Sequence, residues 1–301
     1  MRDLLSPDQP PDLLAGQIAW ASQKALQAKR HRELKAAQTP VQMFLPGMEE
    51  FLRAMPNHIA RSSLFSPVAR GPKKIHAGSI LVSRGDAEIK FWGEQLDEAQ
   101  ADVWMQAIYE ATGVPLGEPV VVTRASFLRG IGRDTGKSQY EWLHRTMQAL
   151  SFAMLVIEVK QAGKHKLAIG QVRALHLVDG FDFDPRAETY SLRIDPRWKQ
   201  MFSNREFALI DWGKRMQFGR GQDMAKALQR LIAASSDSVQ RHRLDWLKAK
   251  LGYGSPIRKF REALLAAMRE LERLELIAGG RIEMSKRGTE QAVWIKLDSS
   301  A

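Results

Sequence analysis

The chain has 301 residues, a formal net charge of +11 and no cysteine. This length allows two domains with separate cores, and contents of 44% hydrophobic and 26% charged residues are ordinary for a globular protein. The lack of cysteine excludes a disulfide framework, Cys-ligated zinc and a thiol nucleophile, and it fits a reducing cytoplasm. The sequence has no apolar stretch of membrane-spanning length and no signal-peptide pattern, so we expect a cytoplasmic protein without a membrane partner.

Residues 1–72 are predicted to form a flexible basic arm and a linker. The segment from Leu13 to Ala37 has helical composition and several lysines and arginines, but its apolar face is thin, so we expect it to order only on a partner. Five prolines interrupt the segment from Thr39 to Pro72. Because proline breaks helices and sheet ladders, we predict a linker with short local structure there.

Residues 73–205 are predicted to form the first domain. Alternation predicts strands over Ile75–Trp92, and helical spacing predicts a helix over Leu96–Ala111. That helix should turn one apolar face inward, made of Ala101, Trp104, Met105 and Ile108. Short strands are expected at Pro119–Thr123 and Tyr190–Ile194, with a turn over Phe181–Pro185.

Ser126–Glu158 is typical of a helix-turn-helix. A short helix ends at glycine, a polar turn follows, and a longer helix has Tyr140, Leu143, Met147 and Leu150 on its inward face. The outward face of the longer helix should contact DNA through Lys137, Ser138, Gln139, Trp142 and Arg145. A hairpin formed by Leu155–Lys160 and Leu167–Leu177 would then act as a wing, with Lys164 and Lys166 near its tip over phosphate.

Residues 206–301 are predicted to repeat this plan after helices at Pro196–Phe202 and Phe207–Gln217. Helices are expected at 224–234, 244–250 and 256–274. Their apolar residues form one stripe, made of Leu247, Leu251, Ile257, Phe260, Leu264, Met268, Leu271 and Leu274. The predicted DNA contacts are Ser255, Arg258, Lys259, Arg261 and Glu262 on the last helix, with Arg281, Lys286 and Arg287 on a hairpin wing over Gly279–Leu297.

The predicted fold class is therefore α+β, with two winged-helix domains in tandem behind the basic arm. The segment Trp212–Leu297 contains 18 Lys and Arg against 9 Asp and Glu, so most of the net positive charge lies in the second domain. A positive field of this kind attracts the phosphate backbone of double-stranded DNA. Ordinary amphipathic helices with solvated charges are the alternative for either unit alone, and two copies of the pattern favour DNA binding.

Other chemistry has little support in the sequence. The run from Gly130 to Ser138 resembles a phosphate-binding loop around Lys137, but Ile131 stands where that motif requires glycine. The histidines are scattered, so we expect no metal site. We also expect no cofactor and no enzymatic activity. His144 and His242 are candidate surface or phosphate contacts. A P-loop NTPase and a winged-helix transcriptional regulator remain the alternative functions.

Several segments resemble the TrfA-type plasmid replication initiators. Arg53-Ala-Met-Pro-Asn57, Ala60-Arg-Ser-Ser-Leu-Phe65 and Pro115-Leu-Gly-Glu-Pro119 are similar to blocks of that family, and Ile257-Arg-Lys-Phe-Arg-Glu262 is similar to its second recognition helix. The resemblance covers about Gln42 to Leu297.

The resemblance implies a protein that binds tandem repeats called iterons at a plasmid origin and helps to melt adjacent A·T-rich DNA. It also implies recruitment of the host initiator, the replicative helicase and the polymerase sliding clamp, and a homodimer in equilibrium with monomer. The candidate clamp-binding residues are Gln42, Met43, Phe44 and Leu45, but Pro46 replaces the final aromatic residue of the family's peptide.

Overall fold

The computed structural model describes residues 52–67, 73–83, 87–115, 117–161, 164–170, 174–202 and 206–297, together with Gln27. Only the backbone is described for residues 160, 161 and 164–167. The segment Gln42–Ala301 forms one compact unit, separate from Met1–Val41. Among the described residues, no helix combines the length and the apolar character needed to cross a membrane.

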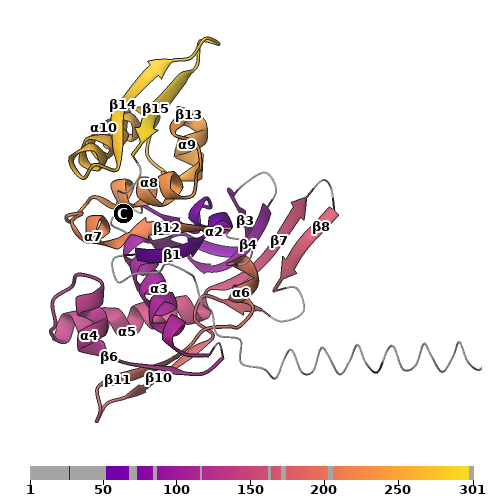
Figure 1. Ribbon diagram of the computed structural model, residues 1–301, viewed down its shortest axis with the longest axis vertical. Coiled ribbons are helices and arrows are strands. Elements are labelled where there is room, and N and C mark those ends of the chain that lie inside the picture. The colour runs from indigo at the N-terminus through magenta and orange to yellow at the C-terminus, as the bar shows by residue number, and fades with distance from the viewer. Residues whose placement is uncertain are drawn as a thin grey trace, which may run out of the picture. The chain divides into compact units, whose positions relative to one another are not determined.

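The first half of the compact unit mixes strands and helices (Figure 1). In chain order its elements are β1 (Leu52–Pro56), α2 (Asn57–Ala60), β2 (Phe65–Ser66), β3 (Ile75–Leu81), β4 (Ala87–Glu94), β5 (Leu96–Asp97), α3 (Glu98–Glu110), η1 (Ala111–Gly113), β6 (Val120–Thr123), α4 (Arg124–Gly130), α5 (Lys137–Phe152), β7 (Met154–Gln161), β8 (Lys164–Ile169), β9 (Leu175–His176), β10 (Gly180–Asp184), β11 (Thr189–Arg193) and α6 (Trp198–Met201).

The second half is shorter and is richer in helix. Its elements are β12 (Phe207–Asp211), α7 (Trp212–Met216), α8 (Asp223–Ala233), β13 (Val239–Arg243), α9 (Leu244–Lys250), α10 (Ile257–Arg273), β14 (Ile277–Met284) and β15 (Glu290–Lys296). The mixture of helices and strands that the sequence predicted is confirmed.

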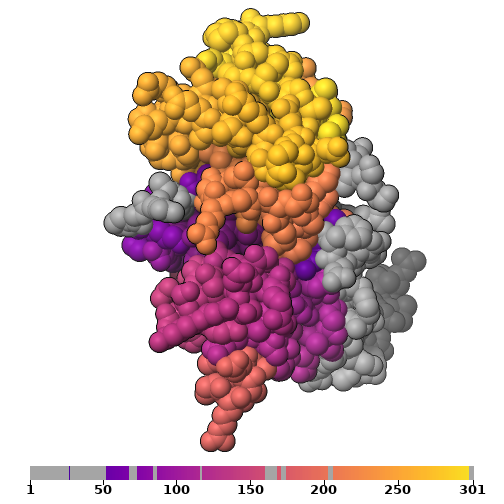
Figure 2. Space-filling view, turned by 90° about the vertical axis from the view of Figure 1, so that its left-hand side faces the viewer, coloured from indigo at the N-terminus to yellow at the C-terminus, as the bar shows by residue number. Residues whose placement is uncertain are grey.

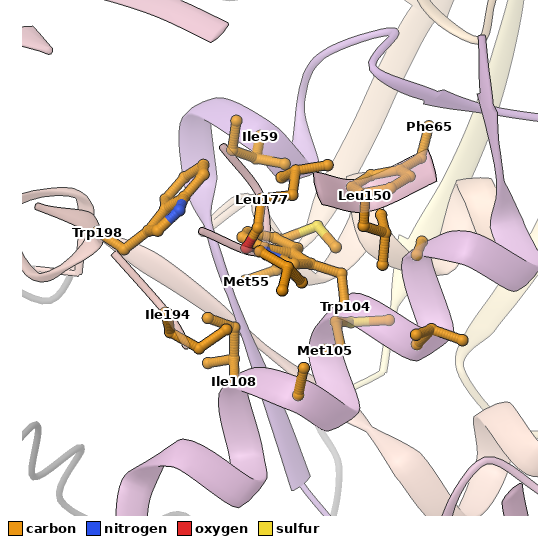
Figure 3. Packing of buried hydrophobic residues seen from close by; sticks show 14 of the residues in the cluster. Met55, Ile59, Phe65, Trp104, Met105, Ile108, Leu150, Leu177, Ile194 and Trp198 are labelled. Carbon is orange, nitrogen blue, oxygen red and sulfur yellow. The ribbon is translucent and has the colours of Figure 1, made fainter. Parts of the chain in front are cut away.

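Helix α3 is the centre of the first core. Asp97 caps it, because its carboxylate accepts from the Gln100 amide while the Gln100 side chain accepts from the Asp97 amide. The predicted inward residues are buried, and the indole of Trp104 donates to the Leu177 carbonyl at 3.0 Å. Its ring packs edge-on against Trp198 with centroids 5.0 Å apart, within the cluster shown in Figure 3. This cluster, together with buried polar side chains such as Glu98 and Asp102, encloses α3 along most of its length.

The expected linker is partly a strand of this core. β1 pairs antiparallel with β12, from Leu52 opposite Asp211 to Pro56 opposite Phe207. Ala54, Met55 and Ile59 are fully buried. The expectation of a linker is therefore wrong for β1, α2 and β2, since proline at the end of a short strand costs no ladder hydrogen bond.

Two further expectations in this half are wrong. Phe207–Gln217 was predicted to be helical, but β12 occupies its first part because Ala208 and Ile210 alternate inward as a strand requires. Phe181–Pro185 was predicted to be a turn, but β10 spans Gly180–Asp184 and pairs with β11, which pairs with β6. Local turn residues were outweighed by this pairing.

The strands after α5 also differ from an isolated hairpin wing. β7 pairs with β8 on one side and with β4 on the other, in a five-stranded sheet that runs β3-β4-β7-β8 with β9 beside β7. The predicted hairpin is therefore part of a larger sheet, to which β4, β3 and β9 also belong.

The second half has its own core, built on α8, α9, α10 and the sheet β13-β15-β14. All but one of the residues predicted in the apolar stripe are buried. Ile257, the first residue of α10, is the exception, with 43% exposed. Ala208 and Ile210 of β12 belong to the first core, so β12, which we placed in the second domain, packs in the first.

The two halves share one order of elements. Each half contains a helix, a strand, two helices and two strands in that order. The elements are α3-β6-α4-α5-β7-β8 in the first half and α8-β13-α9-α10-β14-β15 in the second. Hence α3 and α8 occupy equivalent positions, as do α5 and α10.

Candidate nucleic-acid interface

The turn between α9 and α10 is tight and glycine-rich. Gly252 has φ +62°, and a Cβ on it would lie 3.0 Å from the Ser66 Cβ. This left-handed conformation and close approach both favour glycine. Pro256 then precedes the first residue of α10. The sequence therefore folds here as a helix-turn-helix, and the turn rests against the segment that contains β2.

Exposed polar residues lie on the first turns of α10. Arg258, Lys259 and Glu262 are exposed, and none of them forms an ion pair within the described ranges. Ser255 is half-buried in the turn that precedes them. The residues predicted to contact DNA on this helix therefore lie together on one surface, Ser255 to Glu262.

Two of the predicted contacts are engaged within the protein. Arg261 forms an ion pair with Glu290 of β15, and Arg281 pairs with Glu283 of β14 at 2.8 Å. Both arginine side chains are still about half exposed, at 41% and 54%. Exposed pairs of this kind are weak, so they orient the side chains without removing them from the surface.

The hairpin of the second unit ends in a basic tip. Lys286 and Arg287 are exposed between β14 and β15, and Gly288 has φ +71°. The Gly288 amide donates to the Ser285 carbonyl at 2.9 Å, and the Ser285 amide donates to the Thr289 carbonyl at 2.8 Å. A closed turn with exposed cations fits the predicted wing.

The face of α5 is only partly open. Lys137, Ser138 and Arg145 are exposed, whereas Gln139 and Trp142 are half-buried. The Arg133 guanidinium lies 3.5 Å from the Trp142 ring centre and donates to Gln139 Oε1 at 2.9 Å. Trp142 was expected to point outward, but it packs against the first core under Arg133, because a large aromatic ring gains more from burial than from exposure.

The predicted wing of the first unit is described in backbone only. Lys164 and Lys166 lie on β8, next to β7, and their side chains lie outside the described residues. Gln42, Met43, Phe44 and Leu45 also lie outside the described ranges.

Residues of both helix–helix turns line one cleft. Its lining includes the α4–α5 turn at Ile131–Asp134, Gln139 on α5, and the α9–α10 turn at Gly252–Ser255. The exposed loop Gly219–Gly221, which carries Arg220, lies between them in the same lining. Figure 2 views the side on which α4, α7 and α10 lie in Figure 1. The beginnings of α5 and α10 therefore border one surface.

Arg133 and Arg220 are basic residues of the cleft lining that the sequence analysis did not single out. Burial lowers the pKa of Arg133, Asp102 and Asp97 oppose that shift, and the charge of Arg220 adds to it. The same cleft lining holds four carboxylates, Asp97, Asp102, Asp134 and Asp223, and Asp223 also opposes the shift in the pKa of Arg133. An arginine between two glycines, Gly219 and Gly221, was the available signal.

The two histidines considered as surface contacts are largely enclosed. His144 lies among Phe181, Phe183 and Tyr190, whose hydroxyl is 3.3 Å from its Nδ1. His242 stacks on Trp246 with centroids 5.2 Å apart, and burial lowers its pKa to about 4. Neither is placed to contact phosphate, because each ring is covered by aromatic neighbours.

The phosphate-loop alternative around Lys137 is wrong. That motif requires a strand running into the loop, and here α4 precedes it. Gly130 is the last residue of α4, and its carbonyl accepts from the Trp212 indole at 2.8 Å. In the part of the chain that the structure describes, no three His, Cys, Asp or Glu side chains are grouped to hold a metal ion.

Known proteins are similar to this chain over most of its length. A family model described as TrfA protein matches residues 10–214. The plasmid replication initiator protein TrfA of Escherichia coli is 23% identical over 204 residues, which cover 67% of this chain and 52% of that protein. The chain thus spans about half the length of this curated relative.

Two crystal structures of domains 2 and 3 of RctB are also similar. They align with 80% of this chain and with 98% and 97% of their own chains, at 11% and 12% identity and TM-scores of 0.49 and 0.46.

The family match ends within α7, so α8 to β15 lie beyond it. Since the family model still covers more than half of the 301 residues, the resemblance noted in the sequence is confirmed, and the chain belongs to the TrfA protein family.

Proposed function

We propose that this protein is a plasmid replication initiator that binds iteron repeats at an origin and promotes opening of the adjacent DNA. Membership of the TrfA protein family supports this proposal, and so does the name of the Escherichia coli relative. The observation that carries it is the cleft bordered by both helix-turn-helix turns, with Gln139 of α5 and Ser255 before α10 in one lining.

In this proposal each half is a winged helix. α5 and α10 are the recognition helices, and β14–β15 is the wing of the second unit. Recognition helices on one surface of a chain can enter successive major-groove segments about 10 bp apart on one face of the duplex. A single chain would then cover a whole repeat, and linking two weak readers makes the second docking intramolecular.

The proposed contacts are of two kinds, those to base edges and those to phosphates. Arg258, Lys259 and Glu262 would face base edges and the adjacent backbone. Lys286, Arg287 and Arg220 would contact phosphate, which fixes register without reading sequence. Lys137, Ser138 and Arg145 on α5 would contact base edges and phosphates in the first half of the repeat.

The partners belong to the proposal as well. We propose that the chain binds double-stranded origin DNA, acts without enzymatic chemistry or cofactor in the cytoplasm, and exchanges between dimer and monomer. The host initiator, the replicative helicase and the sliding clamp are its proposed protein partners. Gln42→Ala with Leu45→Ala should abolish capture by the clamp and leave repeat binding unchanged, and equal capture by both proteins would remove the clamp assignment.

A salt titration of the full chain tests the proposal. Affinity for a duplex selected from random sequences should fall steeply with salt, with a log–log slope of about −0.9 for each of the several phosphates that the protein neutralises. A slope near zero would remove the electrostatic interface. A winged-helix transcriptional regulator would share this slope, but permanganate footprinting should detect unpaired thymines beside the repeats only if the protein is an initiator.

A further inference from the structure

Helices α3 and α8, which occupy equivalent positions in the two halves, are joined by a buried ionic cluster. Glu98 and Asp102 lie on α3, Arg215 on α7, and Lys226 and Arg230 on α8. Arg215 Nη2 donates to Glu98 Oε2 at 2.8 Å, and Arg215 Nε donates to Asp102 Oδ1 at 2.5 Å. From α8, Arg230 Nε donates to Glu98 Oε2 at 3.1 Å and Lys226 Nζ donates to Asp102 Oδ2 at 2.6 Å.

The cluster is buried at its centre, and Asp102 and Lys226 at its edge also line the cleft. Glu98 and Arg215 have no exposed surface. Burial alone would raise the pKa of Glu98, but Arg230 and Arg215 together lower it below its ordinary value. Replacing a buried ion pair with apolar residues is often neutral or stabilising, so stability gives little reason for such a cluster. Charged hydrogen bonds are more directional than apolar contacts. A guanidinium group that donates two hydrogen bonds fixes both the distance and the relative rotation of the helices that it joins.

The cluster lies on a continuous path between the two proposed recognition helices. α3 packs against α5 in the first half, and α8 packs against α10 in the second. The opposite face of α8 supplies Leu228, Leu231 and Ile232 to the second core. The side chain of Arg230 also donates to the Phe65 carbonyl at 2.8 Å, which holds α8 to the first half at a second point.

We propose that this cluster fixes the separation and rotation of α5 and α10, and thereby sets the spacing between DNA half-sites that the chain accepts. Glu98 is the central positioning residue, because it joins α3 to α7 and to α8 at once. The inference rests on the proposed function, in which both helices enter the same duplex. It goes further by naming what determines the length of the repeat.

Duplex geometry makes the spacing measurable. One added base pair moves the second half-site by about 3.4 Å along the axis and turns it by about 35° around the axis. A rigid pair of readers cannot follow both changes, whereas readers on a loose joint can. The cluster therefore predicts a sharp dependence of affinity on spacing.

The experiment uses the full chain and the best duplex that the wild type selects from random sequences. Variants of that duplex carry one to three base pairs inserted or deleted between the half-sites, and fluorescence anisotropy gives Kd for each. The wild type should lose about tenfold or more in affinity at one base pair of displacement. Glu98→Gln should bind the best duplex less tightly, but its Kd should vary by less than about threefold across the spacings.

Two more variants make the result decisive. Lys226→Met removes the ion pair with Asp102 and leaves Glu98 with both arginines. It therefore replaces Glu98→Gln as the test if that variant does not fold. Its Kd should also depend less on spacing than the Kd of the wild type. Lys73→Met breaks the Lys73–Asp97 pair, which lies at the start of α3 outside the cluster, and should keep the wild-type profile.

The outcomes separate this inference from the proposed function. A wild type that selects no duplex contradicts DNA reading itself. A wild type that binds tightly at every spacing, or folded Glu98→Gln and Lys226→Met proteins that keep the sharp profile, overturns the spacing inference and leaves DNA binding intact.

Discussion

Arg261 on α10 forms an ion pair with Glu290 on β15, so the proposed recognition helix and the wing hairpin are joined by side chains as well as by the chain. Arg258, one turn earlier, has no such partner in the described part of the protein. We therefore expect the two arginines to act differently. Arg258→Ala should cost about 1–3 kcal/mol in binding and relax preference at one repeat position.

Arg261→Ala should instead weaken all sequences alike and only slightly, because it removes one exposed ion pair to the hairpin and no base contact. Binding of each variant to a randomised duplex pool, followed by sequencing, measures both effects. If Arg258→Ala kept the wild-type sequence preference, α10 would not be the reading helix.

The basic tip of the hairpin gives a second prediction. Lys286→Ala with Arg287→Ala should weaken selected and unselected duplexes by the same factor, because the tip would contact phosphate only. The log–log salt slope should become less negative by up to about 0.9 for each phosphate that the tip no longer neutralises. A change in sequence preference would show that the tip reads bases.

Arg220 gives a third prediction, from its place in the cleft between the two turns. Arg220→Ala should reduce affinity for the full repeat and make the salt slope less negative by about 0.9, as expected when one phosphate is no longer neutralised. The matched control is Arg186→Ala, which changes an exposed arginine in the β10–β11 turn. Equal affinities for these two variants would remove Arg220 from the interface.

His242 predicts a pH dependence of stability. Its pKa is lowered to about 4 by burial, while the unfolded chain has the ordinary value near 6.5. As the pH falls, the unfolded state therefore binds the proton first. The contribution of His242 to the free energy of unfolding is complete above pH 6.5 and is lost as the pH falls to about 4. The loss amounts to about 3 kcal/mol.

Urea unfolding of wild type and His242→Phe at several pH values measures this term, since carboxylates common to both proteins cancel in the difference. The wild type should lose more stability than the variant between pH 6.5 and pH 4. Parallel curves would show that His242 is solvated in the folded protein.

Much of the fold follows from periodicity in the sequence. The spacing of Trp104, Met105 and Ile108 predicted α3, and the stripe from Leu247 to Leu274 predicted α9 and α10, because long amphipathic helices carry their pattern locally. The strand β1 was missed because its partner, β12, is far along the chain. Only that pairing turns Leu52–Pro56 from a proline-interrupted segment into core.

The candidate site was predictable in part for the same reason. Exposed positions such as Arg258 and Lys286 follow from helix and turn periodicity. Arg133, which covers Trp142, and Arg220, which lies in the cleft, depend on tertiary packing. The partners of Glu98 are likewise far along the chain, so no local pattern marks the ionic cluster.

The central claim is that one chain reads DNA with both α5 and α10. Hydroxyl-radical footprinting of the full chain on a single selected repeat tests it most directly. Two protected patches about 10 bp apart on one face of the duplex are expected. Lys137→Ala with Arg145→Ala should weaken one patch and Arg258→Ala with Lys259→Ala the other. A single protected patch that disappears with the α10 variant and is unchanged in the α5 variant would contradict the claim.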